Sequence, residues 1–133
     1  TIRPDELLDV PGACQRWDRV RLGGRASSVR TGEAHWALDR PVTVYGFALW
    51  WRCELLPGVS LATDPAGPAT HWEQLYLPTR EPVRLAAGDR LDLRLRSDSS
   101  REGATIRWQI AHRPAGSDRA LIQRLDMRRG DLG

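Results

Sequence analysis

Residues 90–112, which read RLDLRLRSDSSREGATIRWQIAH, decide the fold class of this chain. In residues 90–96 every second residue is leucine, and charged residues stand between the leucines. The same period of two continues through residues 104–112, where large apolar side chains share one face. This alternation is typical of strands that bury one face. Because the polar stretch between the two segments ends in glycine, the sequence predicts an antiparallel hairpin.

Outside this hairpin, short apolar runs are separated by glycine and proline. Residues 42–56 are almost continuously apolar, which predicts a strand buried on both faces, and Gly46 within them predicts a bulge or a close backbone contact. Leu-Pro-Gly at residues 56–58 and Ala-Gly-Asp at residues 87–89 predict turns. We therefore expect an all-β fold, an antiparallel barrel or sandwich of many short strands.

The two ends of the chain are less regular. Residues 4–8 begin with proline and two acids, which predicts a short helical turn. Residues 117–127 place apolar side chains at helical spacing after a Ser-Asp cap, but they fit a final strand equally well, so both interpretations stay open. We expect residues 1–116 to form the β-domain and residues 117–133 to form a tail or closing element.

Composition excludes several classes of protein. The 133 residues suffice for one domain, and 20 basic side chains, all of them arginine, stand against 17 acidic ones. Because the two signs are interleaved and form no basic stripe, we expect no nucleic-acid partner. No apolar run is long enough to span a bilayer and no signal segment opens the sequence, so we expect a soluble, cytoplasmic protein with no membrane partner.

Few residues suggest chemistry by themselves. Cys14 and Cys53 lie far apart, which leaves an intrachain disulfide open, and the three histidines are scattered, so we predict no metal site. No phosphate loop, dinucleotide fingerprint, zinc-hydrolase motif or nucleophile elbow is present. The chain alone therefore gives little support for complete catalysis.

One local group stands out: Thr70, His71 and Trp72 follow a loop rich in proline and glycine, where a strand is expected to begin. In one interpretation His71 presents its imidazole to a carboxylate or substrate, and Trp72 forms the wall of a pocket for a cationic group. In the other, Trp72 belongs to the core and His71 caps the strand. The residues alone do not decide between the two.

Three segments in order resemble a known family. Residues 44–51 read VYGFALWW, residues 59–65 read VSLATDP, and residues 68–77 read PATHWEQLYL. Together they resemble the C-terminal β-barrel of the protein arginine methyltransferases, which has a hydrophobic strand, a Thr-x-Pro loop, and a Thr-His-Trp loop followed by glutamine and an aromatic strand. The resemblance extends over roughly residues 4–113.

The resemblance implies methyl transfer from S-adenosylmethionine to an arginine of a protein substrate. In that family a preceding domain binds the methyl donor and carries two glutamates that hold the substrate arginine, and neither is found in this sequence. We therefore expect a substrate-side barrel that binds no cofactor itself, is inactive alone, and is completed by a S-adenosylmethionine-binding domain in the same or another chain. The resemblance makes His71 a catalytic candidate that pairs with an acid of that domain. It places Trp72 beside the substrate arginine and gives Thr70 the role of holding the loop.

Three further points stay open. The dimerisation arm of the family has no counterpart here, which leaves homo-oligomerisation undecided. An alternative function is a free-standing, non-catalytic β-sandwich module that engages a peptide or carbohydrate through Trp50, Trp51 and Trp72. A third is a non-catalytic partner subunit that lends its Thr-His-Trp loop to a separate enzyme. Outside the binding-module alternative, we assign Trp50, Trp51 and Trp108 to core packing.

Overall fold

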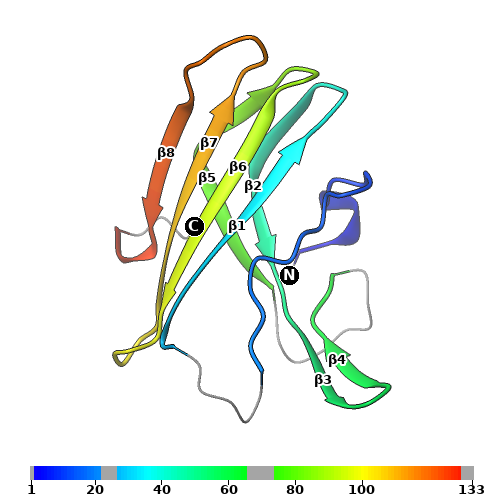
Figure 1. Cartoon of the computed structure of the whole chain (residues 1–133), viewed down its shortest axis with the longest axis vertical. Helices are drawn as coiled ribbons and strands as arrows, with labels where there is room; N and C mark the ends of the chain where they lie inside the picture. The colour runs from blue at the N-terminus through cyan, green and yellow to red at the C-terminus, as the bar shows by residue number, and fades with distance from the viewer. Residues whose placement is uncertain (1, 22–26, 66–73, 130–133) are drawn as a thin grey trace.

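The structure, a computed structural model, describes residues 2–21, 27–65 and 74–129. These residues form eight strands, all paired antiparallel, and two short 3-10 turns, which confirms the predicted all-β fold (Figure 1). The strands form a sheet of order β1-β6-β7-β8 and two smaller sheets, β2-β5 and β3-β4. The bounds are η1 Pro4–Glu6, β1 Val29–Ala37, β2 Val42–Leu49, β3 Arg52–Leu56, β4 Val59–Ala62, β5 Leu75–Leu85, β6 Arg90–Asp98, β7 Thr105–Arg113, β8 Leu121–Asp126 and η2 Met127–Arg129.

The predicted hairpin is β6–β7, and it supplies much of the core. Leu95 lies opposite Trp108 and Leu93 opposite Ile110, and all four side chains are buried. From the other side of the core, buried residues of β5 such as Leu77 pack against them. Each fully buried side chain of this size contributes roughly 1.5–3 kcal/mol. The apolar side chains at the alternating positions of β6 and β7 therefore pack the four-stranded sheet against the β2–β5 pair.

The prediction of one doubly buried strand over residues 42–56 is wrong. The chain forms β2 and β3 with a break between them, and no side chain of β2 is fully buried. The break arises because the Trp51 N–H donates to the hydroxyl of Thr63, at 3.0 Å, and the chain continues into the β3–β4 hairpin. At Gly46 both predicted features are found: the register shifts between Val44 and Gly46, and a Cβ on Gly46 would clash with the ring of Tyr76.

The two ends of the chain form different structures. The predicted turn near the N-terminus is η1, and residues 117–127 contain the strand β8 followed by η2, so the strand alternative is correct there. The strand is favoured over a helix because, paired with the edge of β7, it places Leu125 in a buried position opposite Trp108. The side chain of Gln123 on β8 makes two hydrogen bonds to the backbone of β5: it accepts from the Arg80 N–H at 2.8 Å and donates to the Glu81 carbonyl at 2.9 Å.

The free edge of β1 is covered by the segment that precedes it. The amide side chain of Gln15 bonds both the N–H and the carbonyl of His35, and the Trp36 indole donates to the Ala13 carbonyl at 2.9 Å. Side-chain cover of this kind protects an edge from pairing with another chain. Cys14 and Cys53 are free thiols. In the part of the chain that the structure describes, no helix is long and apolar enough to cross a membrane.

Candidate functional site

The three candidate residues Thr70, His71 and Trp72 lie outside the described residues. The surroundings of the site are therefore built from the residues on either side, which are residues 63–65 after β4 and Gln74 before β5. These residues have well-defined contacts, and the contacts show how the two flanks are held.

Thr63 is the anchor on the first side. Its side chain is 1% exposed, and its backbone N–H donates to the Trp51 carbonyl at 2.9 Å. Its hydroxyl accepts the Trp51 N–H at 3.0 Å, so one residue satisfies both backbone groups of Trp51. On the second side, Gln74 donates its side-chain N–H to the Thr63 carbonyl at 2.7 Å. The two flanks of residues 66–73 are thus tied directly to each other, and we name this arrangement the Thr63–Gln74 clasp.

The N-terminal segment contacts the same place. The N–H of Ile2 donates to the side-chain oxygen of Gln74 at 3.4 Å. Burial, and to a smaller extent the negative charge of Glu6 in η1, raises the pKa of Tyr76. Segments that are more than seventy residues apart in sequence therefore meet beside the start of β5.

Aromatic side chains are exposed near these contacts. Trp51 is 40% exposed, and Tyr76, 42% exposed, donates its hydroxyl to the carbonyl of Tyr45 at 2.8 Å. Among the three tryptophans assigned to the core, only Trp108 is fully buried; Trp50 is half-buried, and the assignment is wrong for Trp51. Two consecutive residues in extended chain point to opposite faces, so the pair Trp50-Trp51 already indicated that both could not face one core.

The residues around the Thr63–Gln74 clasp can position a loop and a ligand. A buried threonine and an amide fix the backbone on both sides of residues 66–73, and a partly exposed indole and phenol stand close by. Such a frame can hold a loop and offer an apolar wall to a ligand. Across the ranges with described placement, no three His, Cys, Asp or Glu side chains come together as metal ligands would.

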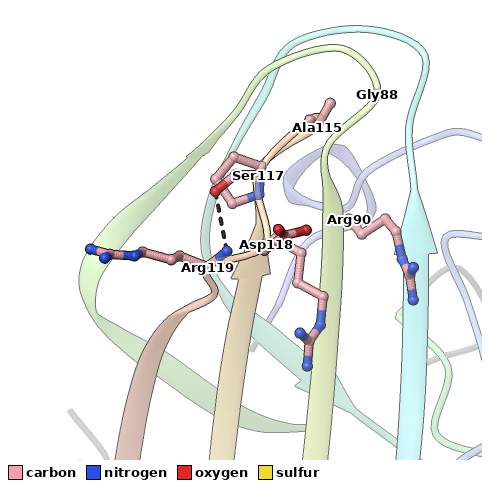
Figure 2. Close-up of a pocket in the computed structure, with 9 residues that line it drawn as sticks. Gly88, Arg90, Ala115, Ser117, Asp118 and Arg119 are labelled. Atoms are coloured by element: carbon pink, nitrogen blue, oxygen red, sulfur yellow. Dashed lines mark hydrogen bonds between the residues drawn. The ribbon is translucent and has the colours of Figure 1, made fainter.

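A hollow lies at the other end of β5, between the turn that follows β5 and the turn that follows β7 (Figure 2). It measures about 320 Å³, and Arg90, Arg113 and Arg119 are among its lining residues. The Ala-Gly-Asp sequence at residues 87–89 predicts a turn here but no site. Alternation did place Arg90 on the outer face of its strand, and that was the available signal.

A buried aspartate holds these two turns together. Asp89 accepts the N–H groups of Ala86 and Ala115, both at 2.9 Å, and lies 2.8 Å from Nε2 of His112. The Ala115 N–H first, then His112 and the Ala86 N–H, lower the pKa of Asp89 to about 2. We name this arrangement the Asp89 clasp. It is the counterpart, at the far end of β5, of the Thr63–Gln74 clasp.

Comparison with known proteins relates the chain to one class of enzyme. No model of a known protein family matches it. Over 94 residues it is 34% identical to an arginine N(omega)-methyltransferase of Streptomyces achromogenes subsp. streptozoticus, and the alignment covers 69% of this chain and 25% of that protein. It is 24% identical to protein arginine N-methyltransferase 2 of Mus musculus, over 66% of this chain and 21% of that protein. It is 25% identical to protein arginine N-methyltransferase 5 of Caenorhabditis elegans, over 64% of this chain and 12% of that protein.

The chain is therefore related to the protein arginine methyltransferases, as the resemblance predicted. It spans a quarter or less of the length of these curated relatives.

Proposed function

We propose that this chain is the substrate-side β-domain of a S-adenosylmethionine-dependent protein arginine methyltransferase, equivalent to the C-terminal barrel of that family. The observation that carries the proposal is the sequence relationship to three arginine methyltransferases. The Thr63–Gln74 clasp supports it, because it fixes both flanks of residues 66–73, the segment that contains the Thr-His-Trp motif.

In this proposal each motif residue has one task. The Trp72 indole lies beside the guanidinium of the substrate arginine, which it stabilises as an aromatic face stabilises a cation. The His71 imidazole pairs with an acid of the neighbouring domain, and Thr70 holds the loop. Glutamates of that neighbouring domain orient the planar guanidinium, because carboxylates bind it through two parallel hydrogen bonds. A cytoplasmic location and an arginine-containing protein substrate are part of the same proposal.

The methyl donor is not assigned to this chain. S-adenosylmethionine supplies the methyl group when bound, and nucleotide-containing ligands commonly lie against a glycine-rich turn that opens an α-helix. The helical elements of the described ranges are two three-residue 3-10 turns, and we assign the donor to neither of them. A second domain, in the same chain or in another, has to bring the donor into line with the acceptor nitrogen.

The test combines binding with activity. Calorimetry on this chain should detect no S-adenosylmethionine binding, and micromolar binding would contradict the proposed division of labour. In the intact enzyme, Trp72→Ala should lower methyl transfer roughly a hundredfold with little change in melting temperature, because misplacing a reacting group by about 1 Å costs that much. The buried Trp108 provides the control, since Trp108→Ala should lower stability first. If Trp72→Ala lowers activity and stability in equal measure, Trp72 belongs to the core.

The exposure of Trp51 favours a second candidate, the free-standing binding module for a peptide or carbohydrate. The two candidates differ in which tryptophan matters. Weaker binding of an arginine-rich peptide after Trp72→Ala, but not after Trp51→Ala, supports the methyltransferase domain. The reverse result supports the binding module.

A further inference from the structure

The outer face of the four-stranded sheet is rich in arginine. The leucines of β6 point into the core, so the residues between them point outward, and β7 and β8 continue the pattern in register. All of the arginines on this face are exposed to solvent. We name it the arginine face; its arginines are Arg90, Arg94 and Arg96 of β6, Arg107 and Arg113 of β7, and Arg124 of β8.

Only part of this positive charge is neutralised within the sheet. Glu33 pairs with Arg94 at 2.9 Å, and Asp92 pairs with Arg113 at 2.7 Å. Arg124 bonds a neutral amide, that of Gln109. The guanidinium groups of Arg90, Arg96 and Arg107 make no hydrogen bond or ion pair within residues 2–21, 27–65 and 74–129. Two carboxylates nevertheless lie near them: the charge of Arg96 acts on Asp98, and Asp126 of β8 lies opposite Arg107.

The register places like charges directly opposite each other. Arg96 lies opposite Arg107, and Arg90 lies opposite Arg113, at the two ends of the β6–β7 pair. Like charges in directly opposed positions destabilise a sheet. Carboxylates offset part of this repulsion, since Asp126 lies opposite Arg107 on β8 and Asp92 pairs with Arg113. A ligand of negative charge would relieve the part that remains.

The shape of the face fits an extended ligand better than a compact one. Besides the hollow of about 320 Å³ beside Arg90, a hollow of about 240 Å³ is lined by Glu33, Asp92 and Arg94 among others, and Arg113 lines both. Figure 2 shows that the side chains of Arg90 and Arg119 point away from each other on either side of the first hollow. A single small anion would not contact both, but a chain with several negative groups can contact arginines along the whole face.

We propose that the arginine face binds an extended acidic polypeptide segment. Alternate residues of a strand are roughly 6.6–6.8 Å apart, so carboxylates at every second residue of an extended peptide match the spacing of Arg94 and Arg96. Each guanidinium offers a planar fork that fits a carboxylate. Single-stranded nucleic acid fits less well, because it uses aromatic side chains for stacking and the outward positions of the sheet carry no Phe, Tyr or Trp. This inference is independent of the methyltransferase proposal.

The test uses a fluorescently labelled peptide of alternating glutamate and serine, measured by anisotropy at low ionic strength, where exposed charges interact most strongly. The double variant Arg96→Gln/Arg107→Gln should bind roughly tenfold more weakly, since each exposed charge pair contributes up to about 1 kcal/mol. Its melting temperature should change little, because the repulsion between the two arginines is removed together with their attraction to Asp98 and Asp126. A merely structural role would lower it.

The matched control removes the same net charge elsewhere. Arg40 and Arg84 are exposed, and Arg84 lies on β5 in the other sheet, so Arg40→Gln/Arg84→Gln should change peptide binding by less than about twofold. Equal weakening by both double variants would show that net charge alone attracts the peptide, and the proposal would fail. It would also fail if the unaltered chain bound no peptide, or if single-stranded DNA displaced the peptide more effectively than unlabelled peptide does.

Discussion

The four-stranded sheet and the β3–β4 hairpin are stabilised in different ways. In the sheet, large apolar side chains such as Leu95 and Ile110 are 1% exposed and form the core. In the hairpin, Leu56 is 65% exposed and Val59 51%, and none of its described side chains is fully buried. The hairpin instead depends on backbone pairing and on the hydrogen bonds of Thr63 at its base. The candidate motif follows the weakly buried region, where local opening costs little free energy.

This difference separates two tasks within a small fold. A well-packed sheet transmits strain and holds its faces in fixed register, so it suits the presentation of charges at regular spacing. A hairpin held by a few polar contacts can adjust to a neighbouring domain or substrate, at the expense of local stability. The variants below test whether the two regions respond to substitution as differently as their burial implies.

The largest contrast is expected between two leucines. Leu95→Ala leaves a cavity in the core and should lower the free energy of unfolding by about 3 kcal/mol. Leu56→Ala removes the same atoms from the exposed end of β3 and should change it by less than about 0.5 kcal/mol. Urea titration followed by tryptophan fluorescence measures both. Similar losses in the two variants would mean that the hairpin is covered in solution, and the comparison would no longer hold.

The next effect concerns Thr63 at the base of the hairpin. Thr63→Val keeps the shape of the side chain but removes the acceptor of the Trp51 N–H, which should cost about 1 kcal/mol. Hydrogen exchange should show faster exchange of the Trp51 amide, while amides of β6 and β7 keep their protection. Thr63→Ser retains the hydroxyl and serves as the control. If the β6 and β7 amides lose as much protection as Trp51, the hairpin is not an independent unit.

The sequence predicted the sheet well and the region of the candidate site only in part. Period-two alternation located β6, β7 and the faces they bury, because a strand with one buried and one solvent-exposed face alternates apolar and polar residues along the sequence. It failed over residues 42–56, where the break between β2 and β3 depends on Thr63, a contact that no local pattern encodes. A long apolar run resembles a buried strand even when its side chains cover a surface.

The candidate site shows the same division. The candidate motif at residues 70–72 is a prediction from the order of the neighbouring segments, and the Thr63–Gln74 clasp joins residues whose pairing has no sequence signature. The arginine face was not predicted, because acidic and basic residues alternate along the sequence and the net charge is only +3. Only strand register assembles the arginines on one side.

The last prediction compares the Asp89 clasp with its counterpart at Thr63, which has no titrating group. The pKa of Asp89 is about 2, below its ordinary value of 3.8, so its carboxylate stabilises the fold above that ordinary value. This stabilisation should be lost as the pH falls from about 4 towards 2, when the folded protein also takes up the proton. Asp89→Asn should be less stable than the unaltered chain near neutral pH, because the charge that holds two N–H groups and His112 is gone.

The measurement is a series of urea titrations between about pH 6 and pH 2, in which the difference between the unaltered chain and Asp89→Asn should shrink towards the acid end. Asp118→Asn, an exposed aspartate in the turn between β7 and β8, removes a carboxylate without removing these contacts and should follow the unaltered chain. Thr63→Val should show a loss that does not change over the same range, because no proton is exchanged there. A constant difference for Asp89→Asn down to about pH 2 would mean that the carboxylate acts through its shape and not its charge. Both clasps would then stabilise the fold independently of pH, and the two ends of β5 would differ only in burial.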